Sequence, residues 1–218
     1  MLVEEIMTTK VVTLKKYDTI QKAYDILTEN HFHHIPIVDE ENHVIGIISD
    51  RDLRDAFPSI FEKVWSKDIL DKPLEQIMKT NVRTIHPLEF VEEVSSIFYE
   101  NELSCLPVTR EGLLVGIITD RDMLNTLIQL TGALQPSSQI EVKVKNTPGT
   151  LAQVVLIIAK ENVQINSVLV YPYAKNANYK IIVLRIQTMN PIVIVNNLKE
   201  QGHEVLWPNL PGVKFHEK

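Results

Sequence analysis

The stretch Gly46-Ile47-Ile48-Ser49-Asp50-Arg51-Asp52-Leu53 returns further along the chain as Gly116-Ile117-Ile118-Thr119-Asp120-Arg121-Asp122-Met123, at an offset of 70 positions. Two earlier blocks return in the same order at an offset of 71, residues 6–13 as 77–84 and residues 34–37 as 105–108. Three blocks in one order at nearly one offset indicate a duplication. The first 130 residues are therefore a tandem repeat.

Each copy is predicted to begin with a strand and a helix. Residues 18–21 are typical of a helix start, with Asp18 as the cap and Gln21 three residues later. Apolar side chains then recur at helical spacing, which predicts one buried helical face. These side chains are Ile20, Ala23, Tyr24 and Leu27 in the first copy and Val91, Val94 and Phe98 in the second.

Two further strands and a second helix complete each copy. Apolar runs at 35–38 and 44–48, separated by the polar turn 39–42, are typical of strands. A helix is expected from about Asp50, and Pro58 is expected to end it. Because a unit of ~60 residues buries little surface alone, the two copies are expected to pack against each other.

The repeated blocks resemble cystathionine-β-synthase (CBS) domains, which in pairs form the Bateman module that senses adenosine nucleotides. The resemblance rests on Pro36 with the block at 46–52, and on Pro107 with the block at 116–122. It covers about residues 1–130 and implies a first CBS domain at 1–60 and a second at 61–131. The implied fold class is α+β, with βαββα repeats.

The repeated Ser/Thr-Asp-Arg-Asp motif has two interpretations. Ser49-x-x-Asp52 and Thr119-x-x-Asp122 have the spacing of a capping box, which satisfies free N–H groups at a helix start. Capping does not explain the arginines, because a helix N-terminus disfavours a cation by about 0.3–1 kcal/mol. Arg51 and Arg121 would suit a phosphate beside the helix N–H groups. The alternative is that they only pair with the neighbouring Asp50 and Asp120.

The resemblance implies roles for particular residues. The hydroxyl of the motif contacts phosphate and its last carboxylate holds the ribose, which assigns Ser49, Asp52, Thr119 and Asp122. Adenine lies between the strand after the Ile-Met block and the strand that carries the proline. Those positions are Val12, Thr13, His34, Ile35 and Pro36 in the first copy, and Arg83, Thr84, Leu106 and Pro107 in the second. The expected ligand is AMP, ADP or ATP, as a regulator and not as a catalytic cofactor.

The two sites are expected to differ, because Cys105 replaces His34 in the second copy. Cys105 itself is interpreted as a small core residue. His31, His33 and His34 lie close in sequence, but no further Cys or His follows at a zinc-like spacing. No metal site is predicted.

The last third of the chain is predicted to be a separate βαββαβ domain with ferredoxin-like order. Residues 132–138 form a turn-rich linker, the domain spans 139–208, and 209–218 are a tail. Strands are expected at 140–144, 163–171, 179–186 and 203–207. One helix follows Pro148-Gly149, with Leu151, Val154, Val155 and Ile158 on its apolar face; the other begins at Asn190-Pro191 as cap and first position, and ends at Gly202.

This segment resembles an ACT domain, through residues 144–151 and Asn166. In ACT domains the loop after the first strand binds amino acids or similar small acids, commonly across a dimer. The corresponding residues are Asn146, Pro148, Gly149, Thr150 and Leu151. Asn146 stands where the family often has an acid, so ligand binding and a purely dimerising role both remain open.

Composition and missing motifs narrow the function. Apolar residues are 44% and charged residues 23% of the chain, and the net charge of -6 argues against a general affinity for nucleic acid. A single cysteine favours a reducing, cytoplasmic location, and no run is long enough to span a membrane. The chain contains no G-x-S-x-G, Walker A, H-E-x-x-H or G-x-G-x-x-G motif. We therefore expect a non-catalytic regulator with no catalytic residues.

The order CBS–CBS–ACT resembles the bacterial acetoin-utilisation (AcuB) family, including residues 168–172 and 202–208. That resemblance implies control of a partner protein in acetoin and acetyl-CoA metabolism, with a link to sporulation. Alternatives are a sensor of S-adenosylmethionine, of a cyclic dinucleotide, or of an amino acid through the ACT domain; a nucleic-acid-binding regulator and an enzyme are weaker alternatives. Consecutive apolar residues at 154–158 and 192–195 exceed one helical face and predict a two-fold homodimer.

Overall fold

A computed structural model describes residues 1–56 and 67–208 of the 218-residue chain. The chain forms two compact units, Met1–Leu124 and Asn125–Lys218, and the division falls inside one helix. The predicted tail at 209–218 and the predicted helix end at Pro58 lie outside the described residues. Among the residues that are described, no helix is long and apolar enough to cross a membrane.

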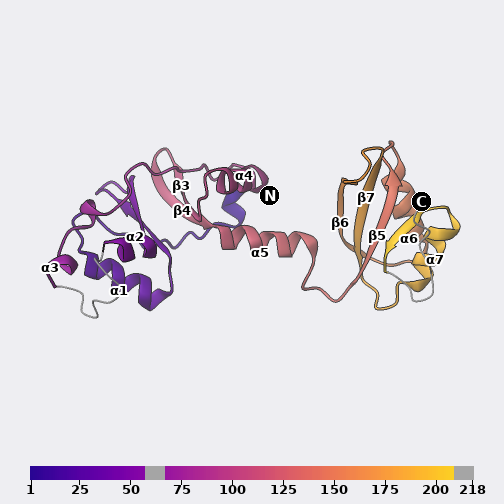
Figure 1. The fold of residues 1–218 in the computed structure, drawn as a ribbon, viewed down its shortest axis with the longest axis horizontal. Helices are drawn as coiled ribbons and strands as arrows, with labels where there is room; N and C mark the ends of the chain where they lie inside the picture. Colours follow the sequence, from indigo (N-terminus) through magenta and orange to yellow (C-terminus); the bar gives the residue numbers. More distant parts are fainter. Residues whose placement is uncertain (57–66, 209–218) are drawn as a thin grey trace. The chain divides into compact units, whose positions relative to one another are not determined.

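The first copy of the repeat contains a short 3-10 helix, two α-helices and a hairpin (Figure 1). These elements are η1 (Val3–Glu5), α1 (Ile20–Asn30), β1 (His34–Val38), β2 (Val44–Ser49) and α2 (Asp50–Asp55). The second copy repeats this order after the short helix α3 (Lys67–Leu70). Its elements are η2 (Leu74–Gln76), α4 (Val91–Glu100), β3 (Cys105–Arg110), β4 (Leu113–Thr119) and α5 (Asp120–Thr131).

The hairpins of the two copies have the same construction. Each is an antiparallel two-stranded sheet in which the proline pairs with an isoleucine, Pro36 with Ile47 and Pro107 with Ile117. A register shift follows at the same place in both copies, after Ile37 and after Val108. The duplication in sequence is thus a duplication in structure.

The strand predicted after each Ile-Met block is absent from the described structure. A single parallel bridge stands there instead, between Leu14 and Ile37 and between Ile85 and Val108. In the first copy Leu14 donates its N–H to Pro36 at 3.2 Å and accepts from Val38 at 2.9 Å. One residue on each segment supplies all of the pairing, so no strand is formed.

Helix α1 begins one residue later than predicted. Its cap is Thr19, whose hydroxyl accepts a hydrogen bond from the N–H of Lys22 at 3.3 Å. The Asp18 carboxylate accepts a hydrogen bond from the N–H of Lys15 and another from Lys22 Nζ, each at 2.7 Å. The predicted capping by Asp18 is therefore wrong, because these two donors occupy its two oxygens and the hydroxyl of Thr19 caps the helix instead. The predicted apolar face is confirmed, with Ile20, Ala23 and Leu27 buried.

The two copies exchange the segments that precede their first long helices. We call residues 3–14 and 74–85 the leading segments of the first and second copy. Thr8 pairs with Ile117 of the second copy, and Lys79 pairs with Ile47 of the first. Buried Val3 packs in the core of the second copy, while buried Leu74 packs in the core of the first. The copies therefore share their cores, as expected from their small size.

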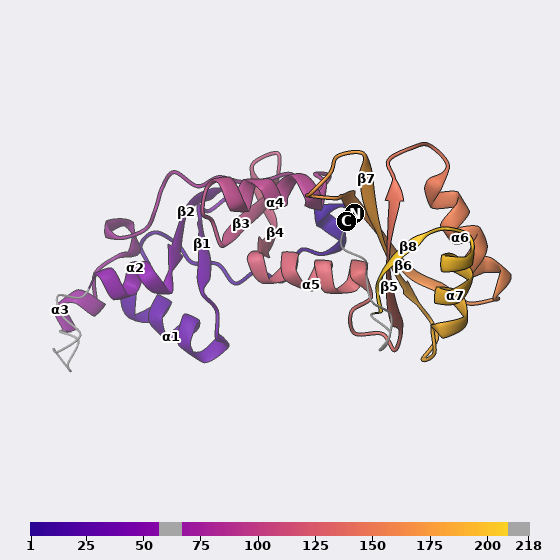
Figure 2. The ribbon, with the colours of Figure 1, turned by 45° about the vertical axis from the view of Figure 1, so that its right-hand side comes forward.

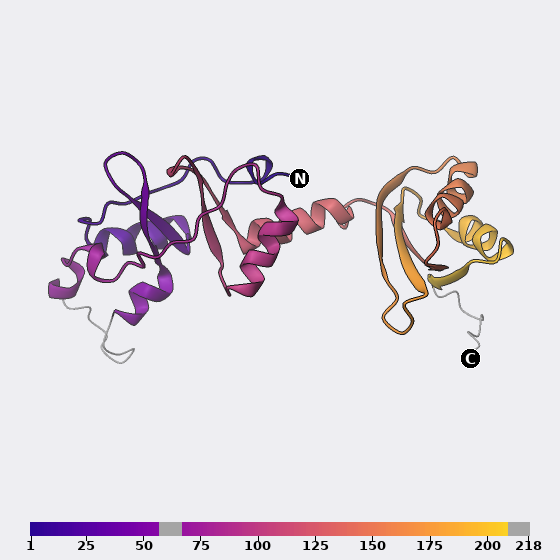
Figure 3. The same ribbon diagram turned by 90° about the horizontal axis from the view of Figure 1, so that it is seen from above.

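The second unit has the predicted βαββαβ order. Its elements are β5 (Ser138–Lys145), α6 (Thr150–Lys160), β6 (Ile165–Pro172), β7 (Tyr179–Ile186), α7 (Ile192–Glu200) and β8 (Glu204–Trp207). The strands form one antiparallel sheet in the order β6-β7-β5-β8. Figure 2 shows α6 and α7 together on one face of this sheet, and Figure 3 shows the long β6–β7 hairpin at its edge.

Packing in the second unit follows the alternation of its strands. Ile140, Val142 and Val144 of β5 are buried, together with Val154 and Ile158 of α6. Leu151 was predicted on the same face, but this prediction is wrong: Leu151 lies exposed in the first turn of α6, and burial in that helix begins at Val154. At α7 the cap is Pro191 itself, and Asn190 Oδ1 accepts from the N–H of Ile192 at 3.2 Å.

Candidate functional site

The first copy of the repeated motif forms a complete capping box at the start of α2. The N–H of Ser49 donates to Asp52 Oδ2 at 2.8 Å, and its hydroxyl donates to the same oxygen at 2.5 Å. In return, the N–H of Asp52 donates to Ser49 Oγ at 3.2 Å. The carboxylate is thus fixed in orientation, and its other oxygen points away from the cap.

The second copy repeats this geometry at the start of α5. Thr119 donates from its N–H and its hydroxyl to Asp122 Oδ2, at 2.8 and 2.7 Å. The N–H of Asp122 donates back to Thr119 Oγ1 at 3.4 Å. The capping interpretation of the motif is therefore confirmed in both copies, and any ligand binding by these residues has to coexist with it.

The arginines of the motif have no structural partner among the described residues. Arg51 and Arg121 are exposed, and neither forms an ion pair within the part of the chain that is described. Asp50 instead lies 3.3 Å from Arg54 and 3.5 Å from the His33 ring. The alternative that the arginines merely pair with the neighbouring aspartates is therefore wrong, which leaves two repeated, exposed cations to explain.

The exchange of leading segments brings each motif against the other copy. Lys79 Nζ, from the second copy, lies 3.1 Å from Asp52 Oδ1 of the first. Burial tends to raise the pKa of Asp52, but hydrogen bonds from Ser49 and Lys79 outweigh it, so the pKa lies below its ordinary value. Asp52 is accordingly an ionised and nearly buried carboxylate at the junction of the two copies.

The positions expected to hold adenine follow the same crosswise arrangement. Thr8 of the first leading segment pairs with Ile117, which lies two residues before the second motif. Leu14 of the same segment donates its N–H to the Pro36 carbonyl. Val12 and Thr13 lie between these two contacts along the chain. We therefore group the residues into two candidate sites. The Asp52 site comprises Ser49, Arg51, Asp52, Arg83, Thr84, Leu106 and Pro107, and the Asp122 site comprises Val12, Thr13, Ile35, Pro36, Thr119, Arg121 and Asp122.

His34 lies where the two copies meet. Its Nε2 is 3.2 Å from the hydroxyl of Ser104, which precedes β3 in the second copy. Burial lowers the pKa of His34 below its ordinary value, against the opposing effect of nearby carboxylates such as Asp50. A neutral imidazole joins the copies here without adding charge.

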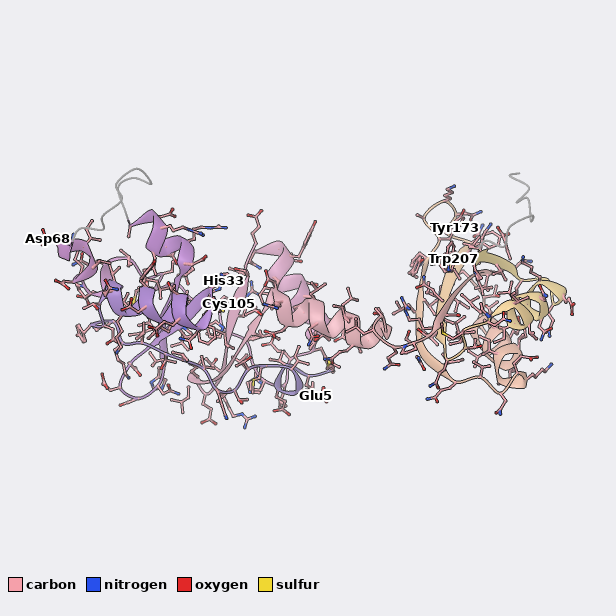
Figure 4. The ribbon with its side chains drawn as sticks, turned by 90° about the horizontal axis from the view of Figure 1, so that it is seen from below. Glu5, His33, Asp68, Cys105, Tyr173 and Trp207 are labelled. Carbon is pink, nitrogen blue, oxygen red and sulfur yellow. The ribbon has the colours of Figure 1, made fainter. Side chains whose placement is uncertain are left out.

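Cys105, the counterpart of His34, is a core residue. Figure 4 labels it at the start of β3, where its side chain is buried. Burial raises the pKa of its thiol to about 12. A thiol with that pKa stays protonated and unreactive at neutral pH, so Cys105 has no nucleophilic role here.

The predicted ligand loop of the second unit is exposed. Gly149 has φ 84°, which a residue with a Cβ rarely adopts, and a Cβ there would meet nothing within 4 Å. A backbone hydrogen bond fixes the position of Asn146, since its N–H donates to the Asn178 carbonyl at 2.8 Å. The Thr150 hydroxyl donates to the Lys145 carbonyl at 3.1 Å. Asn146, Pro148, Gly149 and Leu151 are all exposed.

A pocket of ≈ 540 Å³ lies outside these residues, between the end of α1 and α2. Its lining is partly aromatic and partly charged: Tyr24, Leu27, Thr28, His31, Phe32, His33, Asp50, Leu53 and Arg54. The clustered histidines at 31–34 were its only signal in the sequence. Among the described residues, no group of three His, Cys, Asp or Glu side chains is arranged to hold a metal ion.

Comparison with known proteins identifies the first unit. The CBS domain family matches residues 3–59 and 74–129, which are the two copies of the repeat. A CBS domain-containing protein of Dictyostelium discoideum is 33% identical over 142 residues, covering 63% of this chain and 98% of that protein. The fold and the repeated motif define a CBS pair, a type of module that is generally regulatory. The chain belongs to the CBS domain family.

Two solved structures are similar to the same part of the chain. One is a Vibrio cholerae protein named as an acetoin utilization protein (AcuB), with 32% identity and a TM-score of 0.55, covering 63% of this chain and 98% of that one. The other is the CBS domain pair of protein MJ0100, in complex with 5'-methylthioadenosine and S-adenosyl-L-methionine. It has 30% identity and a TM-score of 0.51, and covers 58% of this chain and 95% of that one.

Proposed function

We propose that this chain is a non-catalytic regulator that binds an adenosine nucleotide, namely AMP, ADP or ATP, in its CBS pair. The observation that carries the proposal is the pair of exposed arginines, Arg51 and Arg121, which lack a partner among the described residues and stand beside fixed carboxylates. A guanidinium binds phosphate through two parallel hydrogen bonds. The similarity to a CBS pair that holds two adenosyl ligands supports the adenosine part.

In this proposal the capping box and the ligand share each carboxylate. Asp52 Oδ2 is used by Ser49, whereas Oδ1 faces the second leading segment. A ribose hydroxyl would donate to Oδ1, and the Ser49 hydroxyl would turn toward a phosphate oxygen. Adenine would lie along the backbone of Leu106 and Pro107, because their side chains are buried. The Asp122 site would act in the same way with Thr119, Val12, Thr13, Ile35 and Pro36. His34 would stand between the two sites.

A second candidate ligand is supported by the same comparison. S-adenosylmethionine shares the adenosine moiety but carries no phosphate, and it is one of the two ligands in the MJ0100 complex. The exposed arginines favour a phosphorylated ligand over it, because a phosphate carries more negative charge than the single carboxylate of S-adenosylmethionine, whose sulfonium and ammonium groups the arginines repel. A cyclic dinucleotide stays an alternative of the same class.

We also propose that the second unit, with its βαββαβ order, is an ACT domain at 139–208 after a linker at 132–138, and that CBS domains occupy 1–60 and 61–131. The strand order β6-β7-β5-β8 supports the ACT assignment. The loop with Asn146 and Gly149 would hold an amino acid, or the domain would only join two chains. We favour the dimerising role, because Asn146 supplies no carboxylate for an ammonium group.

The regulated partner is proposed to act in acetoin and acetyl-CoA metabolism in the cytoplasm, with a link to sporulation. The similarity to the Vibrio cholerae protein supports this proposal, and that similarity covers only the CBS pair. The net charge of -6 of the present chain argues against action on nucleic acid. We expect that the chain does not shift DNA in a gel at physiological salt. We also expect that it does not turn over a bound nucleotide.

The proposal is tested by thermal unfolding with AMP, ADP, ATP, S-adenosylmethionine and cyclic dinucleotides. A ligand that binds only the folded chain stabilises it by about 2.7 kcal/mol at one hundred times Kd. We expect a concentration-dependent rise in Tm with a nucleotide. The double variant Asp52→Asn, Asp122→Asn keeps the shape of both capping boxes and should lose the rise.

The matched control is Asp18→Asn, which changes a carboxylate that contacts Lys15 and Lys22 and neither motif. It should keep the full rise in Tm. An unchanged rise in the double variant would remove Asp52 and Asp122 from the site.

A further inference from the structure

The pocket between α1 and α2 has the properties of a site for a second kind of ligand. Its volume of ≈ 540 Å³ lies within the range of small-molecule sites, which is about 300–1,000 Å³. Its lining residues all belong to the first copy of the repeat, from the second half of α1, the turn at 31–33 and α2. The Asp52 site, in contrast, draws on both copies, since Lys79 of the second copy contacts Asp52 of the first.

Helix α2 separates this pocket from the Asp52 carboxylate. Asp50, Leu53 and Arg54 line the pocket and share one face of the helix, because residues three and four positions apart are neighbours on a helix. Asp52 is two positions away from both Asp50 and Arg54, which places it on the other side of α2, where it contacts Lys79. A ligand in the pocket therefore leaves the Asp52 carboxylate accessible to a nucleotide.

Hydrogen bonds of the backbone fix the turn that shapes the pocket. His31 ends α1 with φ 55°, in the left-handed region. The N–H of Phe32 then donates to the Leu27 carbonyl at 3.0 Å, and the N–H of Asp50 donates to the His33 carbonyl at 3.0 Å. The turn is thereby tied both to α1 and to the start of α2, so the pocket is formed without a ligand.

The second copy keeps this backbone but not these side chains. The N–H of Leu103 donates to the Phe98 carbonyl at 3.1 Å, as that of Phe32 donates to Leu27 in the first copy. Four lining residues that are aromatic or cationic nevertheless have neutral, non-aromatic counterparts: Ser95 for Tyr24, Leu103 for Phe32, Ser104 for His33 and Leu124 for Arg54. The chemistry of the pocket is therefore a property of the first copy and not of the repeat.

Two opposite charges stand side by side in the lining. Arg54 lies one turn after Asp50, and its Nη2 is 3.3 Å from Asp50 Oδ2. Both groups face solvent, with 69% of the Arg54 side chain and 39% of the Asp50 side chain exposed. An exposed ion pair contributes little to stability, so a ligand can contact both groups at little cost. The guanidinium has further donors for a carboxylate, and the Asp50 carboxylate can accept from an ammonium group.

The other important part of the lining is apolar and aromatic. Leu27 and Leu53 are buried, whereas Phe32 is 40% exposed and Tyr24 adds a second ring. Aromatic rings pack favourably against other aromatic rings in stacked or edge-to-face arrangements. The lining thus matches a small ligand that carries an aromatic ring close to both a carboxylate and an ammonium group.

We propose that this pocket binds an aromatic amino acid. Arg54 holds the carboxylate, Asp50 holds the ammonium group, and the rings of Phe32 and Tyr24 contact the aromatic side chain of the ligand. This inference goes beyond the proposed function and uses no residue of the Asp52 or Asp122 sites. The first unit then binds two kinds of ligand, on opposite sides of α2.

Saturation-transfer NMR titrations of the full chain test this inference with three probes. These are phenylalanine, 3-phenylpropanoate, which lacks the ammonium group, and phenethylamine, which lacks the carboxylate. We expect phenylalanine to bind most tightly. Arg54→Gln should weaken the binding of phenylalanine and 3-phenylpropanoate by about tenfold, as for a lost hydrogen bond to a charged group, and should not weaken phenethylamine.

Asp50→Asn keeps the size of its side chain and should show the complementary pattern. We expect it to weaken the binding of phenylalanine and phenethylamine, by about the same factor, and not that of 3-phenylpropanoate. Phe32→Leu gives the first copy the residue of the second and should weaken all three probes, because the ring is lost.

The matched control is Arg110→Gln, which changes an exposed arginine paired with Glu4 at 3.5 Å in the same unit. It should leave the three affinities unchanged, and so should Asn146→Ala in the exposed loop of the second unit. Saturating AMP should not displace phenylalanine.

Four results would overturn this inference. They are no binding of phenylalanine by the unmodified chain, equal effects of Arg54→Gln on the three probes, loss of binding in Asn146→Ala, and displacement of phenylalanine by AMP. The rise in Tm with a nucleotide is measured separately and depends on Asp52 and Asp122. The proposed function therefore stands or fails independently of these results.

Discussion

At the scale of single residues, Asp52 combines a structural role with a proposed binding role. Its Oδ2 completes the cap of α2, while its Oδ1 faces Lys79 from the other copy. The lowered pKa of Asp52 means that its ionised form stabilises the fold at pH values above the ordinary 3.8, and that this contribution disappears as the pH falls through the folded-state pKa. At neutral pH the carboxylate is therefore ionised and able to accept a ribose hydroxyl.

Cys105 provides a residue-scale prediction about reactivity. Burial raises the pKa of its thiol to about 12, so at pH 8 the reactive thiolate is rarer by roughly a thousandfold than in an ordinary cysteine. We expect slow alkylation of the folded chain by iodoacetamide and rapid alkylation in urea. Because the chain has one cysteine, mass spectrometry reads this site alone.

The direction of the pH effect follows from the same pKa. The folded state holds the thiol proton more tightly than the unfolded state. The contribution of Cys105 to the free energy of unfolding is therefore fully present below pH 9.0 and is lost as the pH rises toward 12. Rapid alkylation of the folded chain at pH 8 would show that Cys105 is not in the core.

At the scale of elements, the decisive feature is the exchange of leading segments. Gly116 lies against Met7 and the Thr8 carbonyl, and a Cβ at Gly116 would stand 2.5 Å from Met7 Sδ and 3.2 Å from that carbonyl oxygen. Gly46 has the same relation to Met78 and the Lys79 carbonyl, at 2.8 and 3.2 Å. These glycines have ordinary φ values, so close approach is what their positions require.

We predict that Gly116→Ala lowers the free energy of unfolding of the first unit by about 1–3 kcal/mol, the usual cost of overpacking a core. Met7 has to move, and the Thr8 carbonyl has to shift by a few tenths of an ångström. Urea unfolding measures the loss. Adding Met7→Ala should recover part of the lost free energy of unfolding. The control is Gly202→Ala: a Cβ at Gly202 would meet no atom within 4 Å, although its φ of 83° is strained for alanine. Met7→Ala should not rescue that variant. A Gly116→Ala chain of full stability would contradict the crosswise packing.

The repeat in the sequence predicted both hairpins and the buried faces of α1 and α4, because these depend on periodicity within one copy. It did not predict which motif faces which leading segment, since that depends on contacts between residues about 70 positions apart, such as Lys79 with Asp52. The cap of α1 was misplaced by one residue, because Asp18 and Thr19 both accept hydrogen bonds and only the local turn decides between them. The capping boxes were predicted correctly from spacing alone.

The site was predictable in composition but not in the contacts between the copies. The replacement of His34 by Cys105 was visible in the sequence, whereas the ion pair of Lys79 required the exchanged backbone to be known. The pocket between α1 and α2 was indicated in the sequence only by the clustered histidines at 31–34, because the rest of its lining comes from two helix faces and a loop whose spacing matches no motif.

At the scale of the whole molecule, each of the two units has its own hydrophobic core among the described residues. The first unit encloses two cores joined by the exchanged segments, which places both candidate sites where the copies meet. The second unit encloses one core between its sheet and two helices. A ligand that holds the two copies together would stabilise the first unit, and the second unit would supply the contact with another chain.

The last prediction concerns that contact. Strand β6 is at the edge of the sheet, so one side of its backbone has no partner strand among the described residues. Four consecutive apolar side chains on β6, Val168, Leu169, Val170 and Tyr171, are 38–45% exposed. Natural edge strands usually carry charges or a bend that prevents pairing, and these four residues carry neither. We expect β6 of two chains to pair in a two-fold homodimer, in which the same surface is used twice.

Light scattering of the full chain should then give about twice the chain mass of 24.9 kDa. Val170→Lys places a charge on the edge strand, where burial against a second copy would cost its hydration, so this variant should be monomeric. Tyr99→Lys makes a similar change at an 87% exposed side chain of α4 in the first unit and should stay dimeric. A monomer for the unmodified chain at micromolar concentration would rule out the dimer, and a dimer that survives Val170→Lys would place its interface away from β6.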